Sequence, residues 1–182
     1  MSEPVPFRRV PSGIDFPAQE REILALWDDL DAFRRSIEMR PVDSAYTFYD
    51  GPPFATGSPH YGNILAGILK DIVPRYWTMR GHRIERRFGW DTHGLPVEME
   101  VEKQLGVSGP RQILELGVPK FNDACRRMVT TATGEWEHIT RRIGRWVDFE
   151  NDYKTMDLEF MESIWWVFRQ LWDKGLIYQD FK

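Results

Sequence analysis

The chain has 182 residues, of which 42% are hydrophobic and 29% charged, and its formal net charge is −4. This composition excludes an intrinsically disordered chain, and the negative charge argues against a protein held to nucleic acid by bulk charge alone. The single cysteine, Cys125, excludes an internal disulfide and a cysteine-based zinc cluster, and we interpret it as a small buried apolar residue. Because no apolar run approaches membrane-span length and the N-terminus lacks a signal-peptide core, we expect a cytoplasmic protein.

Residues 1–15 are rich in proline, arginine and glycine, and we predict a flexible arm there, followed by one domain over residues 16–182. In "FPAQEREILALWDDLDAF", a proline stands where a first helical turn tolerates it, and apolar residues then recur at helical spacing. The aromatic and β-branched run "SAYTFYD" predicts a strand over residues 44–50. After a loop rich in glycine and proline, residues 63–81 predict a helix that Pro74 kinks or ends.

The second half of the chain continues as a mixture of short strands and amphipathic helices. We predict a strand at 82–88 and a second glycine- and proline-bounded loop at 89–96. Helices are predicted at 97–106, 110–117, 119–144 and 157–175, and the last of these is capped by Asp157 and stopped by Gly175. Residues 145–157 are predicted to be irregular, and a third strand is predicted to begin at Leu176. Since a domain seldom stops where a strand begins, we expect the front part of a longer protein.

Two basic clusters and one aromatic stripe are candidate functional surfaces. The basic residues are Arg80, His82, Arg83, Arg86 and Arg87 in the first cluster and Arg141, Arg142 and Arg145 in the second. Either cluster could touch nucleic-acid phosphates, but the acidic residues within and beside them favour a solvated surface with ion pairs. We predict that Trp90 belongs to the core and that the stripe containing Trp165 and Phe168 is core in the intact protein.

The stretch "TFYDGPPFATGSPHYGN" is the most unusual connection in the chain. A strand, a glycine-rich loop and a helix together present backbone N–H groups and a positive helix end to an anion. Gly57 and Gly62 would let a ligand approach the backbone, and His60 at the helix entry could donate to phosphate oxygens. The Walker and dinucleotide-binding glycine patterns are absent, so a turn-rich connection with a surface histidine remains an equal alternative.

Several motifs in register extend this reading. "PFATGSPHYGN", followed by "RRFGWDTHGLPVEMEVEKQLG", "ACRRMV", "RIGRWVDFENDYKTM" and "ESIWWVFRQLWDKGLIY", resembles the start of the catalytic domain of the isoleucyl-tRNA synthetases, which are class I aminoacyl-tRNA synthetases. The resemblance spans roughly residues 16–182. The valyl and leucyl families share the first loop, whereas "GWDTHGLPVE" selects the isoleucyl family.

The resemblance implies an α/β fold, the first half of a helix-rich Rossmann-type catalytic domain preceded by an N-terminal helix. It implies ATP-dependent activation of L-isoleucine to isoleucyl-adenylate, with Mg²⁺ accompanying the ATP, and transfer to tRNA(Ile) by a monomeric enzyme. His60 and Asn63 take the places of the two histidines of the family's signature, and we expect both to be catalytic. The expected ATP-binding residues are Pro53, Phe54, Ala55, Thr56, Gly57, Ser58, Pro59, His60, Tyr61, Gly62 and Asn63.

The second loop is expected to hold the amino acid. The resemblance assigns Asp91 to the substrate ammonium, with Gly51 and Pro52 lining the same pocket and His93 as a supporting neighbour. From the residues alone, Asp91 would be read as an ordinary turn or cap residue. No metal site is expected in this segment, because His60 and Asn63 have no third ligand near them in sequence.

Three functions follow from these observations. The first is the N-terminal part of an isoleucine–tRNA ligase, whose lysine-bearing phosphate loop and editing domain would lie beyond Lys182. The second is a non-catalytic module that retains the fold and binds tRNA or a protein. The third, another nucleotidyl transferase with a similar first loop, is disfavoured by "GWDTHGLPVE".

Overall fold

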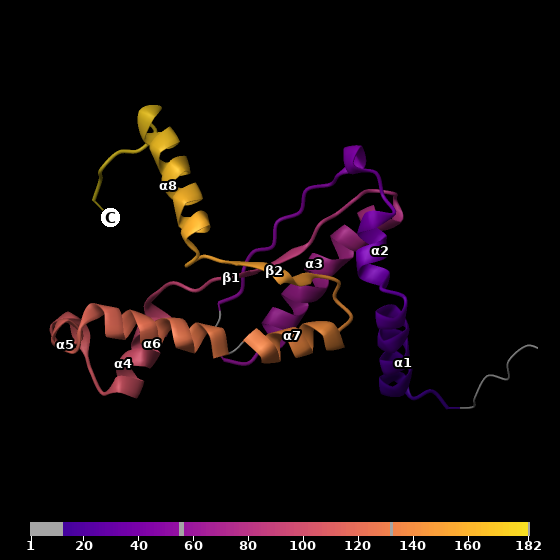
Figure 1. The fold of residues 1–182 in the computed structure, drawn as a ribbon, viewed down its shortest axis with the longest axis horizontal. Coiled ribbons are helices and arrows are strands. Elements are labelled where there is room, and N and C mark those ends of the chain that lie inside the picture. Colours follow the sequence, from indigo (N-terminus) through magenta and orange to yellow (C-terminus); the bar gives the residue numbers. More distant parts are fainter. Residues whose placement is uncertain (1–12, 55–56, 132, 182) are drawn as a thin grey trace, which may run out of the picture.

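The computed structural model describes residues 13–54, 57–131 and 133–181. Within these ranges the elements are the helices α1 (Phe16–Asp29), α2 (Ala32–Glu38), α3 (Tyr61–Met79), α4 (Leu95–Leu105), α5 (Gly109–Leu116), α6 (Val118–Thr131), α7 (Thr133–Arg142) and α8 (Leu158–Asp173), the 3₁₀ turn Val42–Ser44, and the strands β1 (Arg87–Trp90) and β2 (Asp148–Lys154). The molecule is elongated, with α4–α6 at one end and α1 and α2 at the other, while α8 projects away from the body (Figure 1).

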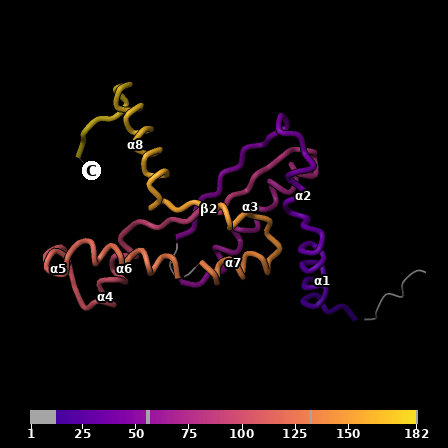
Figure 2. Tube along the Cα trace, viewed as in Figure 1, coloured from indigo at the N-terminus to yellow at the C-terminus, as the bar shows by residue number. Residues whose placement is uncertain are grey.

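The two strands form a small parallel sheet at the centre of the molecule. β1 pairs with β2 through Arg87 with Asp148 and Trp90 with Lys154, with one irregularity between Arg87 and Gly89. Helices α4–α7 make the connection from β1 to β2, as a parallel pair requires (Figure 2). The expected helix-rich α/β class is therefore confirmed.

The strand predicted at residues 44–50 is wrong as a regular strand. The segment is extended and lies alongside β1, but among the described residues it pairs only through isolated parallel bridges, Ala45 with Arg83 and Phe54 with Asp91 (Figure 1). Between these bridges the Asp50 carbonyl accepts a hydrogen bond from the Tyr153 hydroxyl, at 2.9 Å. A side chain thus supplies a contact that a continuous ladder would otherwise make.

Three further predictions near the strands need correction. Residues 145–157 were predicted to be irregular, yet they contain β2, whose polar sequence "DFENDYK" shows no alternation of apolar residues. The strand predicted at 82–88 begins only at Arg87 and continues to Trp90. Residues 176–181 form no strand. In each case pairing decided the outcome, because β2 has β1 beside it and the described part of the chain offers residues 176–181 no partner.

The helices follow the predictions more closely. Pro74 does not end α3, which continues to Met79. Gly106 closes α4 in the left-handed conformation, with φ of 66°, as the predicted stop requires. The long helix predicted at 119–144 is described as α6 and α7 on either side of residue 132. Asp157 precedes α8, but its carboxylate accepts from Lys154 N and makes no cap hydrogen bond to the helix.

The core lies between β1 and helices α4, α6 and α7. Its buried apolar side chains are Phe88, Trp90, Val97, Val101, Phe121, Val129 and Trp136. Trp90 is a core residue, as predicted, and Cys125 is only partly buried against this cluster. Burial raises the pKa of the Cys125 thiol, which therefore stays protonated at neutral pH.

The sequence predicts that both basic clusters lie on a solvated surface, but in the structure two of their arginines are buried. Arg86 is 3% exposed, and its guanidinium lies near the faces of Phe33 and Trp146. Burial lowers the pKa of Arg86 to about 10. Arg145 is also largely buried, with its Nη2 2.7 Å from Asp50 Oδ2. Arg86 donates through Nη2 to the Pro74 carbonyl and the Thr78 hydroxyl, whereas its Nε and Nη1 have no hydrogen-bond partner among the described residues.

Candidate functional site

The loop between the extended segment and α3 is anchored to α7. The Trp136 indole N–H donates to the Gly57 carbonyl at 2.9 Å, and the Ser58 hydroxyl donates to Glu135 at 2.8 Å. Gly57 has φ of +64°, a conformation that disfavours side chains. The predicted ATP-binding residues Ala55 and Thr56 lie outside the described residues. The described part of the loop is thus tied to the core through Trp136.

His60 caps α3 with its own ring. Nδ1 accepts a hydrogen bond from Gly62 N at 3.1 Å, and the side chain is otherwise exposed. Because a ring nitrogen that accepts carries no proton, Nε2 carries the N–H of the neutral imidazole. His60 therefore presents one N–H donor to solvent at the positive end of a 19-residue helix.

Gly62 makes room for this ring. A Cβ at residue 62 would lie 2.9 Å from His60 Cε1 and 3.1 Å from Nδ1, closer than ordinary contact. Any larger residue would push the imidazole away from its capping position. The neighbouring Tyr61 is exposed, so it places no constraint of this kind on the histidine.

Asn63 closes the same cap from the other side. Its Oδ1 accepts from His60 N at 3.0 Å, so His60 and Asn63 form a reciprocal capping box. This capping role was not among the predictions from the sequence, although a polar residue three positions after a helix cap is the spacing that signals a capping box. When Oδ1 is engaged in this way, the Asn63 amide NH₂ remains the group able to donate to a ligand.

We expect the activity of Asn63 variants to separate donation from capping. The sequence resemblance implies isoleucine-dependent pyrophosphate exchange, which Asn63→His should keep or raise and Asn63→Ala should lower. Asn63→Asp keeps the capping oxygen but loses the donor, so it should be at least as slow as Asn63→Ala. Equal exchange rates for all four proteins would remove the position from the mechanism, and a fully active Asn63→Asp would assign it to capping alone.

The two predicted loops meet at the end of β1. Asp91 N donates to the Pro53 carbonyl at 2.8 Å, and Phe54 bridges Asp91 in the parallel sense. Asp91 is half-buried, and its Oδ1 lies 3.4 Å from the amide of the exposed His93. The intervening Thr92 is buried and hydrogen-bonded to Thr155. The structure therefore brings the predicted amino-acid residue Asp91 beside the predicted ATP-loop residues Pro53 and Phe54.

Gly51 and Pro52 follow a buried acidic residue that the sequence analysis did not single out. Asp50 is 5% exposed, with Lys70 Nζ 2.7 Å from Oδ1 and Arg145 Nη2 2.7 Å from Oδ2. Lys70 also donates to the Gly51 carbonyl. In the sequence, Asp50 is the one carboxylate in the stretch "TFYDGPP", where it follows an aromatic run and precedes Gly51 and two prolines. Since buried carboxylates are paired, such a residue predicts a structural ion pair.

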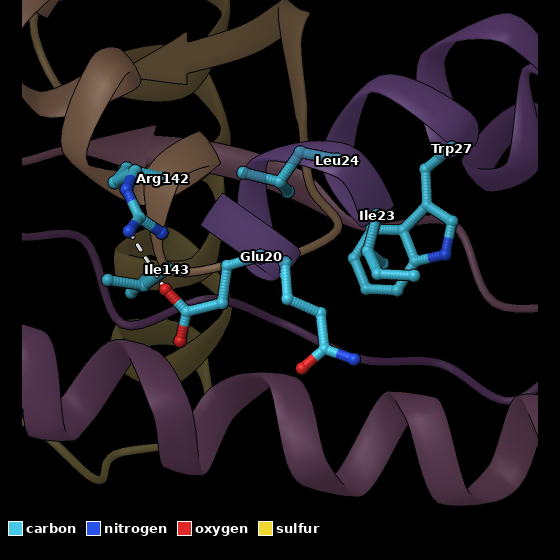
Figure 3. A pocket seen from close by; sticks show the side chains of 8 residues that line it. Glu20, Ile23, Leu24, Trp27, Arg142 and Ile143 are labelled. Atoms are coloured by element: carbon cyan, nitrogen blue, oxygen red, sulfur yellow. Dashed lines mark hydrogen bonds and ion pairs between the residues drawn. The ribbon is translucent and has the colours of Figure 1, made fainter. Parts of the chain in front are cut away.

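Three cavities are found among the described residues, and Asp50, next to Gly51, lines the second of them. One of about 720 Å³ lies between α1 and the turn after α7, where Arg142 pairs with Glu20 at 2.8 Å beside Ile23 and Trp27 (Figure 3). A second, of about 570 Å³, borders residues 45–50, and a third, of about 750 Å³, borders α2 and residues 144–151. None of these three cavities is lined by Pro53, Phe54, His60 or Asp91.

Comparison with known protein families shows to which family this chain belongs. The family model of the tRNA synthetases class I (I, L, M and V) matches residues 22–182. The chain belongs to this family. The resemblance inferred from the sequence motifs is thus confirmed for the class I tRNA synthetases.

Curated relatives of this synthetase chain carry consistent names. It is 55% identical over 167 residues to "Isoleucine–tRNA ligase, cytoplasmic" of Arabidopsis thaliana, which is 92% of this chain and 14% of that protein. It is 58% identical over 168 residues to "Isoleucine–tRNA ligase" of Mycobacterium tuberculosis H37Rv, covering 92% of this chain and 16% of that protein. The chain therefore spans about one-sixth of the length of the relatives that it matches.

Among solved structures, the synthetase chain resembles the LeuRS of Agrobacterium radiobacter K84, crystallised as a ternary complex with tRNA and LeuAMS. The TM-score is 0.61 at 19% identity, and the match covers 92% of this chain and 19% of that one. This likeness supports the fold. Within the residues that the structure describes, no helix is long and apolar enough to span a membrane, and no cluster of three His, Cys, Asp or Glu could hold a metal.

Proposed function

We propose that this chain is the N-terminal part of the catalytic domain of an isoleucine–tRNA ligase. The observation that carries the proposal is the meeting of two loops: Pro53 and Phe54 of the first loop are hydrogen-bonded or bridged to Asp91 of the second. The names of the relatives supply the amino acid and the tRNA. In this proposal residues 16–182 form the first part of the domain and residues 1–15 are an arm preceding it.

The first half of the proposed reaction is adenylate formation. The isoleucine carboxylate attacks the α-phosphorus of MgATP, a P–O bond to the leaving group breaks, and pyrophosphate departs. The loop from Pro53 to Asn63 would hold the nucleotide, with Gly62 leaving room for the adenine. His60 Nε2–H and the start of α3 would donate to phosphate oxygens as negative charge is redistributed among them.

The second loop would bind the amino acid. The Asp91 carboxylate would pair with the substrate ammonium, and Gly51 and Pro52 would line the same pocket next to His93. Its position beside the first loop supports this role, because the amino-acid carboxylate must reach the α-phosphate held there. The isoleucyl group would then pass from the adenylate to a terminal ribose hydroxyl of tRNA(Ile), releasing AMP.

We expect Asp91→Asn to weaken the binding of isoleucine far more than the binding of ATP. Only the amino acid carries the ammonium, so the KM for isoleucine in pyrophosphate exchange should rise roughly tenfold or more, while the KM for ATP changes little. Asp123→Asn removes an exposed carboxylate of α6 and serves as the matched control. Parallel increases of both KM values in Asp91→Asn would indicate a structural role for Asp91 instead.

The whole enzyme would act in the cytoplasm as a monomer. The plant relative is named cytoplasmic, which supports this location. Aminoacylation of tRNA(Ile) by the purified full-length protein, measured with isoleucine and with valine, tests the proposal directly. Absence of isoleucine-dependent charging by a folded full-length protein would contradict it.

A further inference from the structure

A side chain of β2 reaches across the sheet to the start of the proposed amino-acid pocket. The Tyr153 hydroxyl donates to the backbone carbonyl of Asp50 at 2.9 Å, although 103 positions separate the two residues. The strand between them is β1, and its Gly89 is paired with Tyr153 in the register of the sheet. Tyr153 therefore links β2 to the extended segment by crossing over β1.

Glycine at position 89 is what allows this crossing. A Cβ at residue 89 would lie 2.2 Å from the Tyr153 ring carbon Cζ and 2.4 Å from its hydroxyl oxygen. No side chain fits in that space while the ring stays in place. On the outer side, the Tyr153 ring stacks on Phe160 of α8, with centroids 5.6 Å apart and planes 4° apart. Both contacts fix the direction in which the hydroxyl points.

The Tyr153 hydroxyl is protonated at neutral pH. Burial raises the pKa of Tyr153, and the negative charge of Asp50 raises it further. A tyrosine whose pKa lies above its ordinary value of about 10 is fully protonated at neutral pH. The Tyr153 hydroxyl can therefore donate to the Asp50 carbonyl at neutral pH.

The segment held by this bond is short and is fixed at both ends. At one end, the Asp50 carbonyl is bound by Tyr153, and the Asp50 carboxylate is held by Lys70 and Arg145. At the other end, the Pro53 carbonyl accepts from Asp91 N. Gly51 and Pro52 lie between these two anchors. Their distance from Asp91 is thus set by the bond from Tyr153, by the contacts of Lys70 and Arg145, which include the Lys70 bond to the Gly51 carbonyl, and by the bond at the end of β1.

We infer that Tyr153 is a positioning residue for the amino-acid pocket: its hydroxyl holds Gly51 and Pro52 at a fixed distance from Asp91. This inference rests on the proposed function of those three residues. Tyr153 acts through the backbone of Asp50 and touches no substrate itself. Loss of the hydroxyl should therefore affect the fit of isoleucine and leave the nucleotide loop, which Trp136 and the α3 cap hold separately, unchanged.

The test is Tyr153→Phe in the full-length protein. This change removes one oxygen and keeps the ring above Gly89 and against Phe160. The KM for isoleucine in pyrophosphate exchange should rise about fivefold, the scale of one lost hydrogen bond, while the KM for ATP stays within about twofold. Tyr76→Phe removes the same atom from a half-exposed side chain of α3 and should change neither constant.

The outcomes separate the inference from the function on which it rests. An increased isoleucine KM with an unchanged ATP KM supports positioning. A lower melting temperature with both KM values unchanged, or parallel increases of both, assigns Tyr153 to stability alone and overturns the inference while leaving the ligase activity in place. Absence of exchange in the unmutated protein overturns the proposed function and the positioning role together.

Discussion

His60→Ala should slow isoleucine-dependent pyrophosphate exchange by roughly a hundredfold or more in the full-length protein, the scale of losing one transition-state hydrogen-bond donor. The reason is geometric. Gly62 N occupies His60 Nδ1, so the imidazole presents its Nε2–H outward at the start of α3. In the proposed adenylate formation negative charge is redistributed over the phosphate oxygens, and an N–H donor at the start of α3 would stabilise the transition state more than the ground state.

His60 also caps α3, so a loss of activity caused by the lost cap must be distinguished from a loss of the catalytic donor. Losing a helix cap destabilises a protein by about 1 kcal/mol, which could lower activity without any role in catalysis. His60→Ser offers the control, because a serine hydroxyl caps helices well but cannot place an N–H where Nε2 lies. We expect His60→Ser to recover the melting temperature lost in His60→Ala and to remain as slow in exchange.

Near-normal exchange by His60→Ser would assign the histidine to capping and remove it from the reaction. Exchange should be followed at saturating isoleucine, so that changes in the amino-acid pocket around Asp91 do not enter the comparison. The melting temperatures of the same preparations report whether each protein is folded.

The sequence predicted the helices and the position of His60 well, because these depend on local patterns. The apolar spacing in residues 63–79 and the glycines after α3, α4, α5, α7 and α8 are visible without knowledge of the tertiary structure. His60 was expected at a helix entry and lies at the N-cap of α3. The Asn63 capping oxygen was equally local and was missed, since Asn63 was considered only as the substitute for a signature histidine.

The sequence could not predict contacts between distant segments. β2 reads as irregular because "DFENDYK" has no alternation, and its strand conformation comes from pairing with β1. The buried ion pair of Asp50 and Arg145 joins residues 95 positions apart, so the sequence around either residue does not indicate that the two side chains meet. Arg86 looked like a surface charge, although it lies beneath Phe33 and Trp146. In these cases tertiary packing overrides the local pattern.

Residues 1–182 expressed alone should associate and should form little or no adenylate. The described sheet has two strands, which are marginal without further partners, and the extended segment beside β1 leaves backbone groups unpaired. Helix α8 projects from the body with Trp165, Trp166 and Trp172 each more than half exposed (Figure 1). Helix α3 likewise exposes Leu65 and Leu69. Exposed apolar faces of this kind drive association.

Sedimentation velocity and pyrophosphate exchange on the same purified 182-residue chain test this expectation. We expect a broad distribution of associated species, no tRNA charging, and exchange far below that of the full-length protein. Replacing Trp166 and Trp172 together with glutamate should shift the distribution toward the monomer without raising exchange, because a change in solubility adds no phosphate contacts to those of residues 1–182. Robust isoleucine-dependent exchange by a monodisperse chain would contradict the prediction, and it would mean that the loops from Gly51 to His93 are sufficient for activation.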